Sequence, residues 1–174
     1  MPPLRRRQAE WPEEDHTRLR AALARLDPWS FWPVRLESVS GAEYAVVGST
    51  GAFAISICGL EGYAEPDRSG VRIGGSTVTG FREVKRAVKV VRGRLSGSSA
   101  VGEVRPVICL TRAIAGTSRD VRGVRVVRLT DLPGEIANRE RTLDPGSAKR
   151  AASSLGPPAV SAPDARHDDP HDPG

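Results

Sequence analysis

Residues 43–58, which read EYAVVGSTGAFAISIC, contain the pattern that decides the fold class of this 174-residue chain. Two apolar segments, 44–48 and 52–58, flank Ser49-Thr50-Gly51, a short Gly-containing link of the kind that joins two strands in a hairpin. Within 52–58, large apolar side chains alternate with small ones. One face of this strand therefore suits a thick core, and the other suits the close approach of another element.

Further strands and helices are expected on either side of this hairpin. A helix starts after Pro12 and ends at Asp27, and a strand follows at 34–39. Residues 81–95 carry apolar side chains at helical spacing, and residues 107–110 form the continuous apolar run of a strand buried on both faces. The other predicted elements are a small hairpin within 71–78, a strand at 123–129 and helices at 131–138 and 145–155. The order α-β-β-β-α-β-β-α predicts an α/β fold with a mixed sheet flanked by helices.

The sequence predicts one domain between two extensions, with a flexible arm at 1–11, the domain at 12–155 and a disordered acidic tail at 156–174. Trp29, Phe31 and Trp32 are interpreted as an aromatic plug between the first helix and the sheet. Four aspartates against one arginine give the last 14 residues a net charge of −3, so the preceding 160 residues carry +8 of the total of +5. A basic body favours contact with phosphate or another anionic surface, and a merely solvated basic surface is the alternative.

The cysteines and the hydropathy pattern indicate a cytoplasmic protein. Cys58 and Cys109 each lie in an apolar run and are interpreted as reduced core thiols. Because both are expected on neighbouring strands, a disulfide or soft-metal pair is the weaker alternative. The N-terminus shows no apolar segment of a signal peptide, and no apolar stretch approaches the roughly 18 residues of a membrane span. We therefore expect no membrane partner.

Several segments, taken in order, resemble the nuclease-related domain family, known as the NERD domain. Residues 43–55 resemble the family's strand hairpin, 104–110 (VRPVICL) resemble its buried strand, and 123–127 resemble the strand that follows. The predicted order of elements also matches the restriction-endonuclease core. The resemblance covers residues 13–155, and it implies a restriction-endonuclease-like fold, a role in DNA processing and metal-dependent phosphodiester cleavage.

The catalytic positions of this chain depart from the pattern that the resemblance implies. An active enzyme of this type has an acidic residue at the start of the second strand, and an acidic residue and a lysine two positions apart on the third, where they share a face. The two carboxylates hold Mg²⁺, and the lysine assists the reaction. The first position falls on Gly41 or Glu43, and the other two fall on Ser56 and Cys58. Ser56 has no charge, and Cys58 is a soft ligand poorly suited to Mg²⁺. We therefore expect no catalytic residues, no metal and no cofactor, with Glu43 as the candidate Mg²⁺ ligand if activity remains.

A basic face on the helix at 81–95 is the best candidate for a binding surface. Its members fall within an arc of about 120° at about 100° per residue, beside the apolar stripe. They are Arg82, Lys85, Arg86, Lys89 and Arg92. Such a face would contact a phosphate backbone without regard to base sequence, and it contains no aromatic side chain that would stack on unpaired bases. A solvated helix surface is the alternative.

Three hypotheses follow from the sequence. The first is a catalytically inactive nuclease-related domain that acts by binding DNA or a protein partner. The second is an active metal-dependent nuclease with relocated catalytic residues, led by Glu43. The third is a structural protein-interaction module without affinity for nucleic acid.

Overall fold

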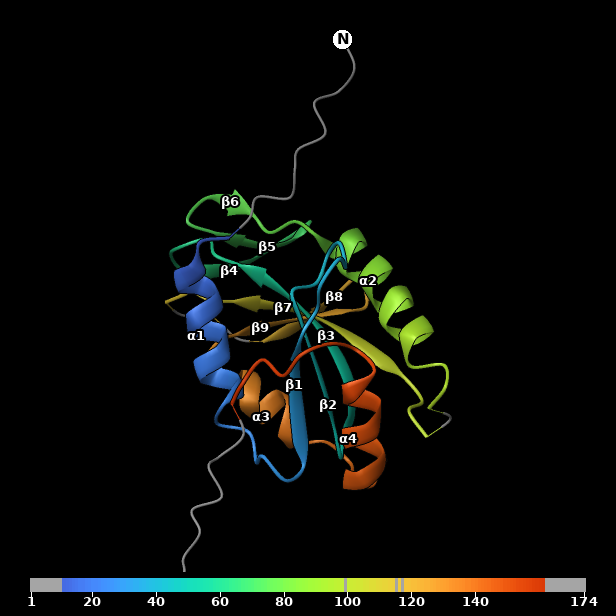
Figure 1. Cartoon of the computed structure of the whole chain (residues 1–174). Coiled ribbons are helices and arrows are strands. Elements are labelled where there is room, and N and C mark those ends of the chain that lie inside the picture. The colour runs from blue at the N-terminus through green and yellow to red at the C-terminus, as the bar shows by residue number, and fades with distance from the viewer. Residues whose placement is uncertain (1–10, 99, 115, 117, 162–174) are drawn as a thin grey trace, which may run out of the picture.

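A computed structural model describes residues 11–98, 100–114, 116 and 118–161 of the chain. Its helices are α1 (Glu13–Leu23), α2 (Phe81–Arg94), α3 (Leu132–Ala137) and α4 (Pro145–Ser153). Its strands are β1 (Phe31–Arg35), β2 (Tyr44–Gly48), β3 (Gly51–Cys58), β4 (Ala64–Asp67), β5 (Gly70–Ile73), β6 (Ser76–Thr77), β7 (Val104–Leu110), β8 (Arg119–Val121) and β9 (Val124–Arg128). A six-stranded mixed sheet has the order β1-β2-β3-β7-β9-β8, and a three-stranded sheet has the order β4-β5-β6 (Figure 1).

The predicted hairpin and the predicted crossover are both confirmed. Strands β2 and β3 pair antiparallel, with Gly48 opposite Gly51 at the turn. Gly51 adopts a φ of +117°, which a side chain would disfavour, so glycine is needed at this position. Strand β3 then continues through β4–β6 and α2 to β7, which pairs with it in parallel, with Ala52 opposite Val104. The sheet is therefore mixed, as the order of elements predicts.

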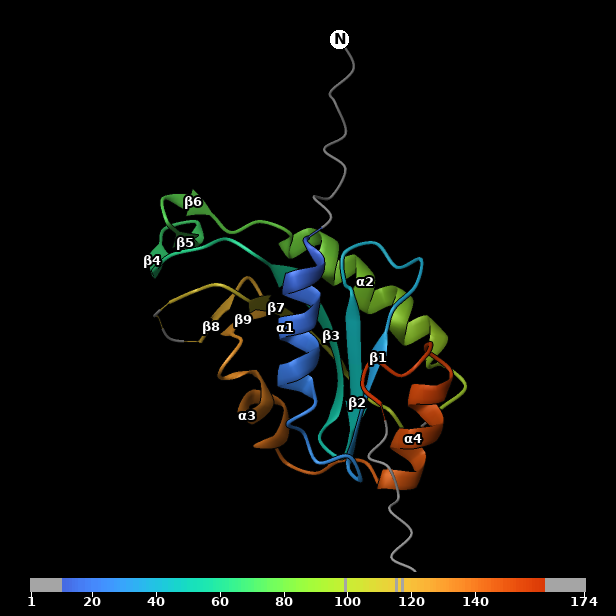
Figure 2. The same cartoon turned by 60° about the vertical axis from the view of Figure 1, so that its left-hand side comes forward.

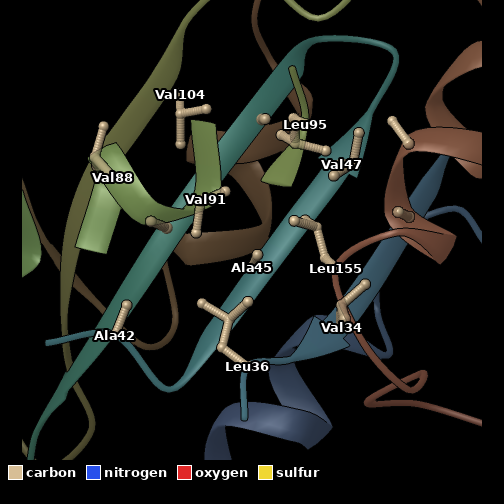
Figure 3. Packing of buried hydrophobic residues seen from close by; sticks show 14 of the residues in the cluster. Val34, Leu36, Ala42, Ala45, Val47, Val88, Val91, Leu95, Val104 and Leu155 are labelled. Atoms are coloured by element: carbon tan, nitrogen blue, oxygen red, sulfur yellow. The ribbon is translucent and has the colours of Figure 1, made fainter. Parts of the chain in front are cut away.

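Helices cover both faces of the six-stranded sheet, α2 and α4 on one side and α1 and α3 on the other (Figure 2). Alternation along β3 separates the two cores. Phe53, Ile55 and Ile57 pack in the cluster beneath α1 and α3, whereas Ala52 and Ala54 pack in the cluster with α2 and α4. The small alanine side chains allow α2 to lie close to the sheet, and Figure 3 shows its apolar side chains in that cluster.

Strand β1 lies earlier in the chain than predicted. It spans Phe31–Arg35 and not residues 34–39. Of the predicted aromatic plug, Phe31 does pack between α1 and the sheet, whereas Trp32 lies against the opposite cluster and Trp29 is exposed. Phe31 lies opposite Gly48, where a Cβ would stand 2.2 Å from the Phe31 ring. The absence of a side chain at Gly48 thus makes room for the aromatic ring and fixes the register. Strands β4 and β8 were not predicted, because their short polar sequences show no apolar alternation.

The structure places residues 156–161, which we expected in the acidic tail, with the domain. The Arg35 N–H donates to the Pro157 carbonyl oxygen over 3.0 Å, and the Ala159 N–H donates to the Pro33 carbonyl oxygen over 2.9 Å. This segment therefore covers the outer edge of β1 and satisfies backbone groups that an edge strand leaves unpaired. The rest of the predicted tail and residues 1–10 of the predicted arm lie outside the described residues. Within the described ranges, no helix has the length and apolar character needed to cross a membrane.

Candidate functional site

Glu43 immediately precedes β2, where the resemblance places the first acidic residue. Its Oε2 accepts a hydrogen bond from the Ile57 N–H over 2.8 Å, and its own N–H donates to the Ile55 carbonyl oxygen over 3.0 Å. Burial raises the pKa of the Glu43 carboxyl group, although the hydrogen bond from Ile57 acts in the opposite direction. The carboxylate thus satisfies an amide of β3 that lies beyond the last residue pair of the β2–β3 ladder.

Ser56 and Cys58 lie on the side of β3 that faces α2. Cys58 packs in an apolar cluster with Phe81 and Val84 of α2, and alternation places Ser56 on the same face, between Ala54 and Cys58. Ser56 is partly buried and Cys58 is buried. Burial raises the pKa of the Cys58 thiol, so the thiol is protonated at neutral pH and is a poor nucleophile.

These three positions do not fit Mg²⁺. A Mg²⁺ site needs oxygen ligands in a near-octahedral arrangement, usually with one or two carboxylates. Glu43 is a lone carboxylate already bonded to Ile57, Ser56 is neutral, and the protonated thiol of Cys58 is a soft donor. In the part of the chain that the structure describes, no three His, Cys, Asp or Glu side chains gather where they would hold a metal ion. We therefore derive no catalytic step through a metal.

The two cysteines lie on opposite faces of the sheet. Cys58 pairs in register with Leu110, whereas Cys109 pairs with Ile57. Cys109 packs in the cluster beneath α1 and α3, and Cys58 packs on the α2 side. Both are free and buried, and burial raises the pKa of both thiols. The prediction of buried core thiols is confirmed, and a shared disulfide or soft-metal site is ruled out by their placement.

The predicted basic face of α2 is exposed along its whole length. The apolar side of the helix, which includes Val84 and Val91, packs on the sheet, and the cations project on the outer side. All five are exposed: Arg82, Lys85, Arg86, Lys89 and Arg92. The ion pairs found among the described residues involve none of these five side chains. No carboxylate of the described residues therefore lies within ion-pair distance of these five side chains.

The turn between β8 and β9 extends this basic surface. The Arg122 guanidinium lies 6.0 Å from the centre of the Phe81 ring, at the first residue of α2. The Lys85 ammonium lies 3.7 Å from the point where a Cβ on Gly123 would stand. Arg122 is exposed, and nothing in the sequence joins it to the basic face, because it lies 28 residues beyond the end of α2. Only the pairing of β7 with β9 brings this turn to the helix.

On the opposite side of the molecule, a buried ion pair joins α1 to the end of β7. Asp15 accepts hydrogen bonds from the Thr111 hydroxyl and the Arg112 Nε, each over 2.8 Å. Burial alone would raise the pKa of Asp15, but the hydrogen bonds from Arg112 and Thr111 lower it below the ordinary value. Arg112 also forms an ion pair with Glu14. With Arg18 and Glu61, Arg112 lines a hollow of about 310 Å³. Arg18 and Arg112, the two described cations that line this hollow, each have an acidic partner.

A buried His–Tyr pair lies between α1 and β2. The Nδ1 atom of His16 is 3.0 Å from the Tyr44 hydroxyl, which also accepts a hydrogen bond from Arg20 over 3.4 Å. Burial lowers the pKa of His16, so the imidazole is neutral at neutral pH. Sequence reasoning missed this pair, since the two residues lie 28 positions apart and neither belongs to a recognisable motif. The contact holds the helix on the sheet.

Comparison with protein families, with characterised proteins and with solved structures found none that matches this chain.

Proposed function

We propose that this domain binds duplex nucleic acid through the basic face of α2 and does not cleave it. In this proposal the chain is a nuclease-related domain of restriction-endonuclease-like fold that has lost its catalytic residues. The observation that carries the proposal is the set of five exposed cations on one helix face, none of which has a carboxylate partner among the described residues.

The dimensions of this face suit a phosphate backbone. Arg82 and Arg92 are ten residues apart, which corresponds to roughly 15 Å along the helix axis at about 1.5 Å per residue. Duplex DNA carries one phosphate charge per about 1.7 Å of its axis, so a helix of this length lies beside several phosphates. Binding by such a face depends on the release of counterions, and is therefore strongly salt-dependent and independent of base sequence.

Two further observations favour duplex binding without cleavage. The exposed aromatic residues Trp29 and Tyr63 lie outside α2, so the basic face has no aromatic surface on which unpaired bases would stack. The catalytic positions Glu43, Ser56 and Cys58 provide neither a metal site nor a positive charge beside a scissile phosphate.

The salt dependence of binding tests the proposal. Five phosphate contacts predict a slope of about −4.5 in a plot of log K against log salt concentration, and removal of three contacts reduces its magnitude to about 1.8. The triple variant Arg82→Gln/Lys85→Gln/Lys89→Gln removes these three contacts. If the variant and the parent protein bind the duplex equally at 1 M salt, where the counterion effect vanishes, the variant binds it about 80-fold more weakly at 200 mM salt. Fluorescence anisotropy with a labelled random-sequence duplex measures both quantities.

A matched triple variant distinguishes the loss of cations from the basic face of α2 from a general decrease in net charge. Arg25, Arg141 and Lys149 are exposed and lie outside α2, and their replacement by Gln changes the net charge by the same amount. We expect this control variant to retain nearly all of the affinity and slope of the parent. Equal losses in the two variants, or a parent protein whose affinity does not depend on salt, would refute a binding site on α2.

A further inference from the structure

The β8–β9 turn contains an arginine in a backbone conformation that arginine disfavours. Val121 pairs with Val124, so Arg122 and Gly123 are the two turn residues, with φ values of +53° and +79°. Two positive φ values define the type I′ turn, whose first position strongly favours Asn, Asp or Gly. A side chain in the left-handed region places its Cβ close to the following carbonyl oxygen. The backbone conformation alone therefore favours a different residue at this position.

A second cation, Lys85, lies against the same turn as Arg122. The Arg122 guanidinium lies over the Phe81 ring at 6.0 Å, and the Lys85 ammonium adjoins Gly123 in the same turn. The neighbouring carboxylate of Asp120 lies 3.3 Å from Arg125 and forms an ion pair with that residue. Among the described residues, no ion pair includes Arg122 or Lys85. A polyanion bound at this corner would therefore gain favourable charge interactions with both cations.

We propose that Arg122 is a phosphate-binding residue, and that the type I′ turn holds its guanidinium beside Lys85 as part of the basic face of α2. This inference rests on the proposed function and adds to it a second element that contacts the nucleic acid. The Arg122 guanidinium has the planar array of donors that matches two phosphate oxygens at once. Backbone strain at a binding residue is retained where the strain positions the binding group.

The variant Arg122→Asn separates binding from stability, since asparagine suits the turn and cannot pair with a phosphate. We expect the melting temperature to rise by about 1–4 °C, because the relief of backbone strain outweighs the loss of the contact between the guanidinium and the Phe81 ring. We expect the slope of log K against log salt to decrease in magnitude by about 0.9, and the affinity to fall about 15-fold at 50 mM salt and about 4-fold at 200 mM. The probe is the same random-sequence duplex in the presence of the parent protein and each variant.

The variant Arg141→Asn is the matched control, because Arg141 is an exposed arginine of the loop between α3 and α4. We expect it to keep the affinity of the parent and to show no rise in melting temperature. An Arg122→Asn protein that binds as tightly as the parent overturns the role of Arg122 and leaves the proposed function standing. A melting temperature that does not rise overturns the argument from strain, and a parent protein that does not bind the duplex overturns both proposals.

Discussion

Substitution of Glu43 distinguishes a structural carboxylate from a metal ligand. In the structure its Oε2 accepts the Ile57 N–H over 2.8 Å in a partly buried position. Glu43→Ala leaves that amide without its acceptor, which we expect to cost about 1–3 kcal/mol of the free energy of unfolding. Glu43→Gln retains an oxygen acceptor and removes the charge, so we expect it to be at least as stable as the parent at pH 7.

The pH dependence of these variants gives a second test. Because burial raises the pKa of Glu43 above its ordinary value of 4.5, ionisation of this group lowers the stability of the parent as the pH rises through the folded-state pKa. Glu43→Gln cannot ionise, so its stability advantage should be present at pH 7 and disappear below about pH 4.5. Urea unfolding with an m-value of about 2 kcal/mol/M would show the Ala variant shifted by about 0.5–1.5 M to lower urea concentration.

The opposite pattern would refute this account of Glu43. If Gln and Ala substitutions destabilised the protein equally, the hydrogen bond to Ile57 would not be the source of the effect. If Mg²⁺ raised the stability of the parent and of neither variant, Glu43 would be a metal ligand, since only ligand binding to the native state shifts the unfolding equilibrium in this way.

Two further predictions concern the buried polar groups beneath α1. Asp15→Asn should lower the free energy of unfolding by about 2–3 kcal/mol, because the buried carboxylate is the acceptor for two side chains, whereas Glu14→Gln at an exposed position should change it by less than about 0.5 kcal/mol. If urea unfolding showed the same loss of stability for Asp15→Asn and Glu14→Gln, the burial of the Asp15 carboxylate would be contradicted. Burial lowers the pKa of His16 in the folded protein, so as the pH falls the imidazole becomes protonated in the unfolded chain before it does in the folded one. The free energy of unfolding should therefore decrease as the pH falls from about 6.5 through the folded-state pKa. His16→Gln should remove this decrease in thermal unfolding measured from pH 7.5 to 5, and an unchanged pH profile would show that other groups cause it.

Elements whose apolar side chains recur at regular spacing could be predicted from the sequence alone. Residues 52–58 alternate between large and small side chains, and the structure places the two sets in separate cores on opposite faces of β3. Residues 81–95 form a helix within one residue of the predicted bounds, because its apolar stripe is regular and Gly80 precedes it. These patterns depend on local spacing, which is visible in any single sequence.

Features that depend on tertiary contacts could not be predicted in this way. The register of β1 depends on the space that Gly48 leaves for Phe31, and the attachment of residues 157–159 depends on the open edge of that strand. Neither contact leaves a periodic signal in the sequence. The same reason explains why Arg122 was missed, since only the assembled sheet brings its turn to α2.

At the candidate site, the sequence identified the exposed cations of α2 but gave no information about their partners. Helical spacing alone places Arg82 and Lys89 on one side of the helix, and the structure confirms that both are exposed. At the positions that the resemblance implies to be catalytic, the residue types of Ser56 and Cys58 already exclude a carboxylate and a lysine. The hydrogen bond of Glu43 to β3 required the structure, because it joins residues 14 positions apart.

Electrophoresis of a supercoiled plasmid incubated with the purified protein and Mg²⁺ or Mn²⁺ tests the central claim most directly. We predict that the parent protein retards the plasmid at low salt, and that the plasmid is recovered fully supercoiled when the protein is removed. The Glu43→Ala variant should give the same result, because this residue has no catalytic role in our account. Recovery of nicked or linear plasmid from the parent, but not from Glu43→Ala, would contradict the account and identify the domain as a metal-dependent nuclease.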